Sequence, residues 1–459
     1  MGRSMDELRD HYTQPEGRIE DPPKTWIEAI RYLGPSVIIS ATIVGSGEII
    51  LTASLGAAVG YSMLWWVLFS CWSKSILQAE LARYIVLSGD TYLRALNRIP
   101  GRISGPRKDF SWTIGLGLIG FATGLTGLGG LIGGAGLALS MVVSEIQPLY
   151  AVGGLALLAA VLLGTGHYQR IEKIMLAFVV TFTVLTLSGA VTMQWTEFSV
   201  SMSELGAGFT FDFPVEYAVL ALAAYGYTGV NAGEVASYTY WCIEKGYPAR
   251  IGRYDGSEAW FIRAEGWLRV LRADVWVTLL LLTCATIPFY LLGAGVLHSL
   301  GRTPSGTETI SALSLMFTQT LGAWSIWPFA VGAFAILFSS SLAGVAAGAR
   351  FIPDYLIELG YLDRESLSAR QAIIRWYCLG IPFVGFGLYA GFERPVLMVT
   401  IAASYAAIML PIQSGMTIYL QTQYLPARVR PRKTAYWLLR LMFMVQSVLA
   451  IAVIYFAVL

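Results

Sequence analysis

Two glutamates stand at points where glycine interrupts a hydrophobic segment. Glu48 follows Gly-Ser-Gly in "ATIVGSGEIILTASLGAAVG", residues 41–60, and Glu234 follows Gly233 in "AYGYTGVNAGEVASYTY". Both segments are long and apolar enough to cross a bilayer. A carboxylate at the centre of a span costs about 2.5–3.5 kcal/mol on insertion scales, so it normally faces a cavity or a partner. The two glutamates therefore predict a site inside the membrane.

The two interruptions also resemble each other. "VGSGEIILTAS" and "VNAGEVASYTY" share a valine, a short segment of small or polar residues, and then Gly-Glu. They lie five predicted spans apart, and an odd spacing inverts the second copy relative to the first. This arrangement is typical of inverted-repeat transporters, whose discontinuous first and sixth helices expose carbonyls and helix ends at the bilayer midplane. Glycine at each interruption allows the backbone to leave helical geometry.

If the two carboxylates meet, they need a positive charge. At a separation of 4 Å their repulsion would be about 4 kcal/mol at an effective dielectric constant near 20. A divalent cation would relieve it, and so would one shared proton. Carboxylate, carbonyl and hydroxyl oxygens are hard ligands suited to Mg²⁺, Mn²⁺ or Ca²⁺. The predicted metal ligands are Glu48, Glu234, Gly45, Ser46, Asn231 and Thr228.

A purely structural interpretation stays open for each of these residues. Glu48 could cap a half-helix by accepting its free amide hydrogens, and Glu234 could pair with a neighbouring hydroxyl or with Lys74. The hydroxyls and Asn231 could serve only to satisfy nearby backbone groups. In the eighth predicted span, Ser339, Ser340 and Ser341 of "FSSSLAGVAAGAR" are candidates for sodium binding or gating, with bonds to their own helix as the alternative.

The composition is that of an all-α polytopic membrane protein. The chain is 56% hydrophobic and 13% charged, with a mean hydropathy of +0.61, whereas a soluble domain is about 25% charged. Residues 1–31 are polar and predict a cytosolic tail, and residues 32–458 predict a single transmembrane domain of about eleven helices. The predicted spans are 33–58, 61–87, 112–141, 149–166, 172–194, 213–238, 273–298, 322–349, 372–391, 395–420 and 435–458.

Lysine and arginine alternate strongly between the loops. They collect in the even-numbered loops, such as "RALNRIPGRISGPRK" and "PARVRPRK", whereas the odd-numbered loops offer only Arg302 and Arg394. The positive-inside rule then places the amino terminus in the cytoplasm and the carboxyl terminus outside, and we expect a prokaryotic-type plasma membrane. Residues 244–272 predict a cytoplasmic interfacial segment, in which "GSEAWFIRAEGWLRVLR" places tryptophan and leucine near one helical face. An ordinary amphipathic connector is the alternative.

Several function classes have no support in the sequence. No segment resembles a nucleotide-binding loop, a catalytic triad or a zinc signature, so we expect no enzyme and no cofactor. The net charge of +2 is too balanced to indicate nucleic-acid binding. No required protein partner is evident, and the expected partners are the metal ion and the lipid bilayer.

The chain resembles the Nramp family of divalent-metal transporters. The resemblance extends from "GPSVIISATIVGSGEIILTASLGAAVGYSMLWWVLFS" through "LQAELARYIVLSGDTYLRAL" and returns in "FSSSLAGVAAGARFIPDYL" and "IMLPIQSGMTIYL". It implies a LeuT-like fold in which spans 1–5 and 6–10 form an inverted repeat, followed by an eleventh span.

The departures from the family concern the site itself. The family's Asp-Pro-Gly-Asn motif corresponds to Gly45 through Glu48, and its Met-Pro-His motif to the region of Val230–Gly233. A metal-binding glutamine of the family's tenth span aligns with Met409, and the charged residues associated with proton transfer in its third span are absent. The lost thioether favours a harder, all-oxygen site, as in a divergent Nramp-related branch that carries magnesium.

Three functions follow as hypotheses. The first is a secondary transporter or facilitator of a divalent cation that works by alternating access, with Glu48 and Glu234 as principal ligands. The second is a carrier of a small organic solute, alone or together with sodium, that uses the aromatic residues near the sixth-span break. The third is a non-transporting membrane receptor or scaffold. The separation of the two carboxylates and the nature of the cavity between them discriminate among these hypotheses.

Overall fold

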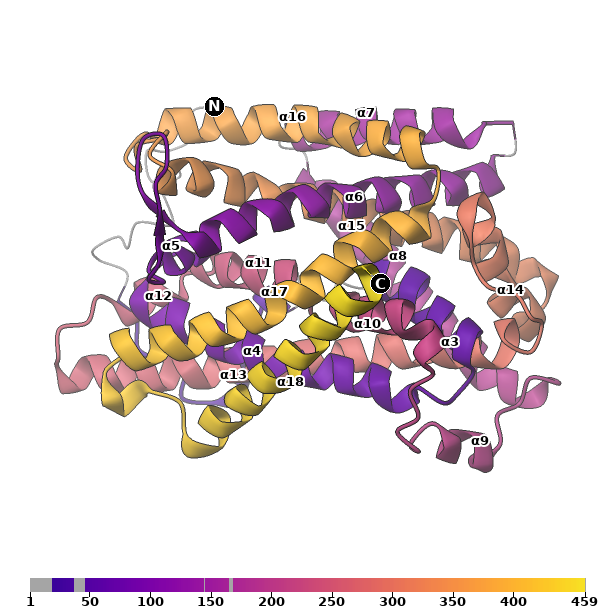
Figure 1. Ribbon diagram of the computed structural model, residues 1–459, viewed down its shortest axis with the longest axis horizontal. Coiled ribbons are helices and arrows are strands. Elements are labelled where there is room, and N and C mark those ends of the chain that lie inside the picture. The colour runs from indigo at the N-terminus through magenta and orange to yellow at the C-terminus, as the bar shows by residue number, and fades with distance from the viewer. Residues whose placement is uncertain (1–18, 37–45, 144, 165–167, 459) are drawn as a thin grey trace.

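The computed structural model describes residues 19–36, 46–143, 145–164 and 168–458, which are almost entirely helical (Figure 1). Two short strands, β1 (Arg102–Ile103) and β2 (Phe110–Ser111), pair antiparallel with Arg102 opposite Ser111. The α-helices are α1 (Trp26–Ile30), α3 (Ala53–Val59), α4 (Leu64–Ser88), α5 (Tyr92–Asn97), α6 (Trp112–Val142), α7 (Pro148–Gly164), α8 (Tyr168–Thr192), α9 (Met202–Ala207), α10 (Ala218–Tyr227), α11 (Ala232–Glu244), α12 (Tyr247–Ile251), α13 (Glu258–Leu292), α14 (Thr309–Leu321), α15 (Ile326–Glu358), α16 (Leu367–Phe392), α17 (Pro395–Tyr424) and α18 (Lys433–Val458). The π-helical segments are η2 (Ser46–Thr52) and η5 (Gly293–Leu297), and the 3₁₀ segments are η3 (Met193–Trp195), η4 (Val215–Tyr217), η6 (Gly306–Glu308), η7 (Ala323–Ser325) and η8 (Ala427–Val429).

Each predicted span contains helix within the described residues. In this part of the chain, six helices are long and apolar enough to cross a membrane: Trp112–Val142, Glu258–Leu297, Ala323–Glu358, Leu367–Phe392, Pro395–Tyr424 and Lys433–Phe456. Two shorter apolar helices are Gly47–Val59 and Pro148–Gly164. The all-α membrane class is therefore confirmed, whereas the number of eleven spans stays a prediction.

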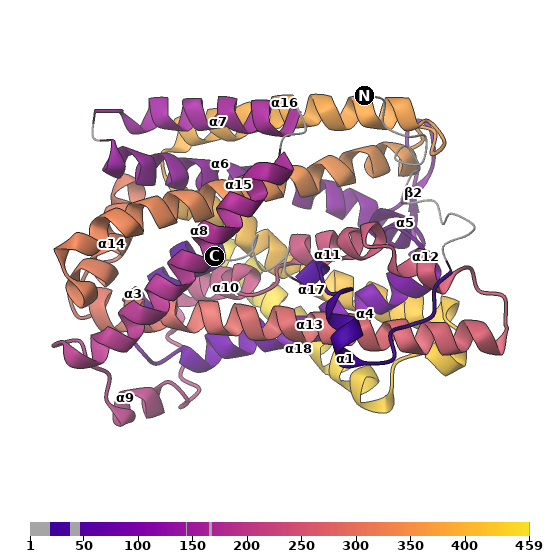
Figure 2. The same ribbon diagram turned by 180° about the vertical axis from the view of Figure 1, so that it is seen from behind.

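The helices form two sides with a broken helix between them. α6, α7, α15 and α16 contact one another on one side, and α4 packs against α13 on the other (Figures 1 and 2). α10 and α11 lie between these groups and contact both α4 and α17. This places the sixth predicted span, with its interruption, at the centre of the molecule.

The glycines of α6 allow its neighbours to approach closely. A Cβ atom at Gly130 would lie 2.7 Å from Val399 of α17, and one at Gly117 would lie 2.5 Å from the hydroxyl oxygen of Tyr355 in α15. Small residues permit such contacts between helices in lipid, where apolar burial contributes little to association. The glycine-rich third span is thus a packing surface.

The predicted interfacial segment, residues 244–272, contains α12 and the start of α13. Residues 258–292 form one continuous helix of 35 residues, α13, which includes most of the segment and the seventh predicted span. Trp260 and Trp267 are 1% and 0% exposed. The indole nitrogen of Trp267 donates to the carbonyl of Glu20 at 2.9 Å, and its ring contacts Tyr32 edge to face. The apolar face of this segment is covered by residues near the amino terminus and by α12.

Candidate functional site at two helix breaks

The interruption in the sixth predicted span is a short extended segment between α10 and α11. Gly229 has φ = +73°, a conformation that glycine adopts without the strain of a side chain. Asn231 is the N-cap of α11: its Oδ1 accepts from the Glu234 amide at 3.0 Å, and Glu234 Oε2 accepts from the Asn231 amide at 2.8 Å. This reciprocal capping box defines the start of α11. The proposed structural role of Asn231 is therefore present in the structure.

The first interruption lies against the second. A Cβ atom at Gly47 would be 2.6 Å from the carbonyl oxygen of Tyr227. The hydroxyl of Thr52 shares a hydrogen bond with that of Thr228 at 2.8 Å, and Glu48 Oε1 accepts from the Gly229 amide at 3.2 Å. The two halves of the predicted repeat thus meet directly at their breaks.

Glu48 is enclosed by these contacts. The residue is 0% exposed, and its Oε1 also accepts from the Thr286 hydroxyl of α13 at 3.2 Å. Its partners join η2, the α10–α11 segment and α13. Glu48 therefore joins the two breaks, and the amide from which it accepts belongs to the opposite half of the molecule; whether it is a metal ligand stays a prediction.

Lys74 of α4 reaches the same junction from the other side. Its side chain is fully buried, and Nζ donates to the carbonyl oxygens of Tyr225 and Thr228, each at 2.5 Å. Glu48 and Glu234 both lie close enough to act on this ammonium electrostatically. The sequence marked Lys74 as a possible counter-ion, but the carbonyls that it binds were visible only once the chain was folded.

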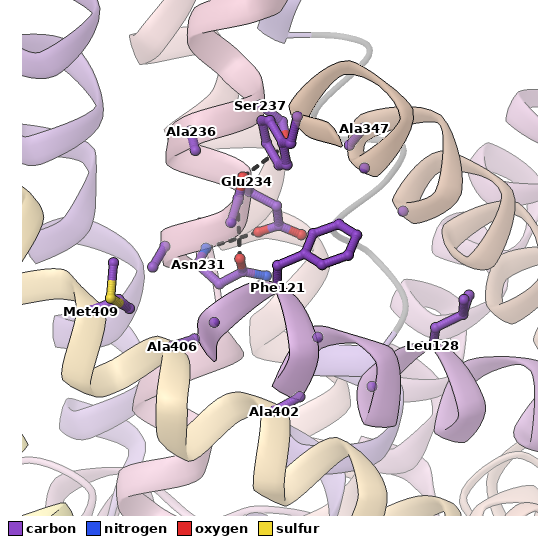
Figure 3. Close-up of a pocket in the computed structure, with 18 of the residues that line it drawn as sticks. Phe121, Leu128, Asn231, Glu234, Ala236, Ser237, Ala347, Ala402, Ala406 and Met409 are labelled. Atoms are coloured by element: carbon purple, nitrogen blue, oxygen red, sulfur yellow. Dashed lines mark hydrogen bonds between the residues drawn. The ribbon is translucent and has the colours of Figure 1, made fainter. Parts of the chain in front are cut away.

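Glu234 lines a cavity of about 260 Å³ that lies between α6, α11, α15 and α17. Figure 3 shows its carboxylate pointing toward Phe121 of α6, with the capping bonds to Asn231 behind it. Among the described residues that line this cavity, Glu234 is the only one with a charged side chain. The aromatic residues of the lining are Tyr92, Phe121, Tyr227, Trp241, Phe351, Tyr355, Tyr377 and Tyr405.

Gln413 of α17 is a candidate ligand that the sequence analysis missed. The residue is 1% exposed, and its Nε2 donates to the Tyr92 hydroxyl and to the Ala232 carbonyl, both at 2.8 Å. Its Oε1 is buried and has no hydrogen-bond partner in the described part of the chain. Gln413 follows Met409, the position aligned with the family's glutamine, by one helical turn, and both line the cavity. A spacing of four residues places two side chains on one helix face, and this signal could have identified it.

The other predicted site residues divide into three groups. Gly45 lies outside the described residues, as does the side chain of Ser46. Ser339 and Ser341 donate to Ile336 and Leu337 carbonyls of their own helix, as the alternative interpretation held, whereas Ser340 lines the cavity. In the described residues, no group of three or more His, Cys, Asp or Glu side chains is placed to hold a metal ion.

The broken helix α10–α11, which meets η2 beside a cavity within an almost entirely helical membrane domain, is the arrangement of an integral membrane protein of the LeuT-like fold. The family model described as "Natural resistance-associated macrophage protein-like" matches residues 36–456. The chain belongs to this Nramp family.

Solved structures agree on the fold. The manganese transporter of Eremococcus coleocola, as its H236A mutant, is 14% identical with a TM-score of 0.64, over 97% of this chain and 90% of that one. Mhp1, a nucleobase-cation-symport-1 family transporter, is 13% identical with a TM-score of 0.59, over 97% and 92% of the two chains. MhsT in complex with L-phenylalanine is 12% identical with a TM-score of 0.55, over 95% and 99%. No curated protein sequence matched the chain significantly.

Proposed function

We propose that this protein is a secondary transporter or facilitator of a divalent cation, in which Glu234 is the principal ligand. The observation that carries the proposal is the place of Glu234: among the described lining residues, it is the one carboxylate that projects into the cavity, from the first turn of α11. Membership of the Nramp family and the fold shared with a manganese transporter support a metal cation as the cargo.

The charges around the breaks suggest different roles for the two glutamates. With Glu48 and Glu234 ionised and Lys74 protonated, the cluster carries a net charge of −1. Lys74 acts on both glutamates, and Glu48 is engaged at the junction, so we assign the guest to the carboxylate that lines the cavity, Glu234. One carboxylate is sufficient for an ion such as Mg²⁺, which is usually held by one or two carboxylates and keeps several waters.

Neutral oxygens complete the proposed site. Gln413 and Asn231, which both carry a side-chain amide oxygen, line the same cavity as Glu234. Met409 lines it too (Figure 3), so a thioether is present although the sixth-span methionine of the family is absent. The expectation of an all-oxygen site is therefore weakened, and a softer ion such as Mn²⁺ is as suitable a test cargo as Mg²⁺.

Cation entry would neutralise Glu234 and favour movement of the two broken helices as a unit. The Glu48–Gly229 and Thr52–Thr228 hydrogen bonds connect η2 to the α10–α11 segment, so a displacement of one break is transmitted to the other. A ligand shifts such an equilibrium only through its different affinity for the two states. The neutralised carboxylate provides that difference in our proposal.

Uptake into proteoliposomes tests the proposal. Mn²⁺, Mg²⁺ and Ca²⁺ uptake is compared for the parent, Glu234→Gln and the control Glu204→Gln. Glu204 is also the third residue of a capping box, with Ser201, but it lies on α9 and does not line the cavity. We expect the first variant to lose at least tenfold in uptake and the control to match the parent. A parent that moves none of these ions above empty liposomes contradicts the proposal.

A small organic cation is a second candidate cargo, and the aromatic lining favours it. Eight aromatic residues line a cavity with one carboxylate, and aromatic faces attract ammonium groups within about 6 Å. A panel of radiolabelled amines in the same liposomes separates the two proposals. Saturable amine uptake that Mn²⁺ does not inhibit, together with no metal uptake, would favour this second function.

The orientation predicted from the sequence also stands as a proposal. Loops assigned to the cytoplasm converge in the structure on one hollow, which Arg94, Arg98, Arg253 and Arg364 line. Because positive charge is retained on the cytoplasmic side, this convergence supports a single cytoplasmic face. Labelling of a cysteine introduced at Arg253 in sealed, right-side-out vesicles tests it: protection until the membrane is opened is expected.

A further inference from the structure

The last turn of α10 presents carbonyl oxygens that have no partner within the helix. Helix carboxyl ends leave such groups free and carry a partial negative charge. Here Tyr225 and Thr228 carbonyls both accept from Lys74 Nζ at 2.5 Å. The Ser70 hydroxyl of the same helix, α4, lies 3.2 Å and 2.9 Å from these two oxygens. The two carbonyl oxygens thus accept from a buried positive charge and also from the Ser70 hydroxyl, which donates to both.

The peptide group between Thr228 and Gly229 lies between two opposite charges. Its carbonyl accepts from the Lys74 ammonium, and its amide donates to Glu48 Oε1 at 3.2 Å. A peptide dipole in this orientation is stabilised at both ends. The Lys74 ammonium therefore holds the sixth-span break in the conformation that Glu48 contacts.

Discontinuous helices of secondary transporters use the same type of carbonyls to coordinate Na⁺. We propose that the end of α10 is a monovalent-cation site whose permanent occupant is the Lys74 ammonium, so that the breaks are held together without a dissolved sodium or potassium ion. Lys74 is a positioning residue in this scheme: it acts on the substrate cavity through the Thr228–Gly229 peptide. The inference concerns the resident cation and does not depend on which cargo the cavity carries.

Removal of the ammonium should convert this occupied site into a vacant one. In Lys74→Ala, the two carbonyls lose their cation, Glu234 and Glu48 lose a nearby positive charge, and the space of a side chain opens beside the carbonyls. A small monovalent cation should then enter. In Lys74→Met, a neutral chain of similar length occupies the space, so the charge is lost but no cation can be accommodated.

Thermal unfolding of the purified, detergent-solubilised protein tests the inference. The parent, Lys74→Ala and Lys74→Met are each measured without divalent ions in sodium chloride, potassium chloride or methylammonium chloride. N-methylglucamine chloride, with a cation too large for the site, keeps the ionic strength equal. We expect both variants to melt several degrees below the parent. In Lys74→Ala, one of the small cations should restore at least half of this decrease in melting temperature, and the effect should saturate with cation concentration. None of the small cations should raise the melting temperature of Lys74→Met.

Lys245 provides a matched control. It is the C-cap residue of α11, the other half of the broken helix, and its side chain is only partly buried. Lys245→Ala should show no specific recovery by small cations. If Lys74→Ala melts identically in all four salts, or if Lys245→Ala recovers equally, the inference is wrong.

The parent provides a test that needs no variant to fold. Its melting midpoint in sodium chloride should equal that in N-methylglucamine chloride at the same ionic strength, because its site is already filled. A saturable sodium-dependent rise in the parent would overturn the inference even if Lys74→Ala cannot be purified. Because no cargo is present, failure of divalent-cation uptake would leave this result unaffected, and the reverse also holds.

Discussion

Glu48 and Glu234 follow glycine at corresponding interruptions in the two halves of the molecule, yet the fold gives them different surroundings. Glu48 is 0% exposed and accepts from an amide and a hydroxyl of other segments. Glu234 accepts from the amide of its own N-cap and projects into the cavity. Chemically identical side chains in similar motifs thus become a junction between two helices and a candidate ligand. The cost of placing a charge in the membrane thus predicts that each carboxylate has a partner. It does not predict which group that partner is.

The largest effect is expected at the junction. Glu48→Ala would leave the Gly229 amide and the Thr286 hydroxyl without their acceptor and would remove one of the negative charges that act on the Lys74 ammonium. Breaking a buried charged arrangement from one side costs about 3–5 kcal/mol. We expect Glu48→Ala to lower the melting temperature markedly. Glu48→Gln should lower it less, because glutamine keeps an acceptor oxygen. Equal melting of Glu48→Ala and the parent would show that Glu48 does not hold the breaks together.

The second prediction concerns stabilisation by the cargo. A ligand at 100 times its dissociation constant stabilises the folded state by about 2.7 kcal/mol. Mn²⁺ or Mg²⁺ should therefore raise the melting midpoint of the parent and of Glu204→Gln but not that of Glu234→Gln. Without added metal, Glu234→Gln should melt close to the parent, because glutamine can still accept from the Asn231 amide. If the metal ion raises the melting temperature of Glu234→Gln as much as that of the parent, Glu234 is not the principal ligand.

Contact between the two breaks can be tested sterically. Gly47→Ala would place a Cβ atom 2.6 Å from the Tyr227 carbonyl oxygen, against backbone that cannot easily move. Overpacking of this type costs about 1–3 kcal/mol. Gly380→Ala on α16 is the control, since a Cβ atom there meets nothing within 4 Å. Thermal unfolding should show a clearly lower melting temperature for Gly47→Ala and not for Gly380→Ala. Equal melting temperatures for the two variants would mean that the breaks are not in contact.

The hydroxyl pair between the halves should contribute less. A double-mutant cycle with Thr52→Val and Thr228→Val isolates the hydrogen bond between their side chains, which measures 2.8 Å. Neutral hydrogen bonds contribute about 0.5–1.5 kcal/mol net. We expect a coupling energy in this range from the four melting curves. Additive effects would show that these hydroxyls act independently.

The smallest effect is expected far from both breaks, at the segment that covers α13. A hydrogen bond from Tyr32 and the ion pair with Arg250 hold the pKa of Glu20 below its ordinary value. Because the folded-state pKa is lowered, this stabilisation is present above the unfolded pKa and is lost as the pH falls through the folded pKa. The Glu20 side chain is 46% exposed, so we expect about 0–1 kcal/mol. The melting difference between the parent and Glu20→Gln should shrink as the pH falls below the ordinary glutamate pKa and vanish once Glu20 is protonated in the folded state; a constant difference would contradict the assignment.

Much of the fold was predictable because hydrophobic runs must become helices in a membrane. Backbone groups in lipid have to bond within their own segment, so the runs located the helices, and Gly229 and Gly233 located the sixth-span break. The interfacial location of residues 244–272 stays a prediction, because amphipathic character is the same whether protein or lipid covers the apolar face. Trp267 is covered by protein, and residues more than 200 positions earlier in the chain provide that cover.

The candidate site was predictable only in part, for a related reason. Glu48 and Glu234 were marked by the cost of their charge, and Lys74 by the same argument. Gln413 was missed because an uncharged amide costs less than a charge to place in the membrane, so it does not stand out in the sequence. The structure marks it through its buried Oε1, which has no hydrogen-bond partner in the described part of the chain. Ser339 and Ser341 could not be separated from Ser340, since their roles depend on how α15 is rotated.

By itself the sequence determined that this chain is a helical membrane protein, that two spans are interrupted at related motifs, and which acidic groups need partners. These properties follow from local hydrophobicity, from the backbone freedom of glycine and from the cost of burying charge. Only the tertiary structure decided that Lys74 binds the end of α10, that Glu48 closes the junction and that Glu234 faces the cavity. Those outcomes depend on distances between segments that are remote in the chain, because the strength of an electrostatic or hydrogen-bonding contact is set by geometry that no local pattern encodes.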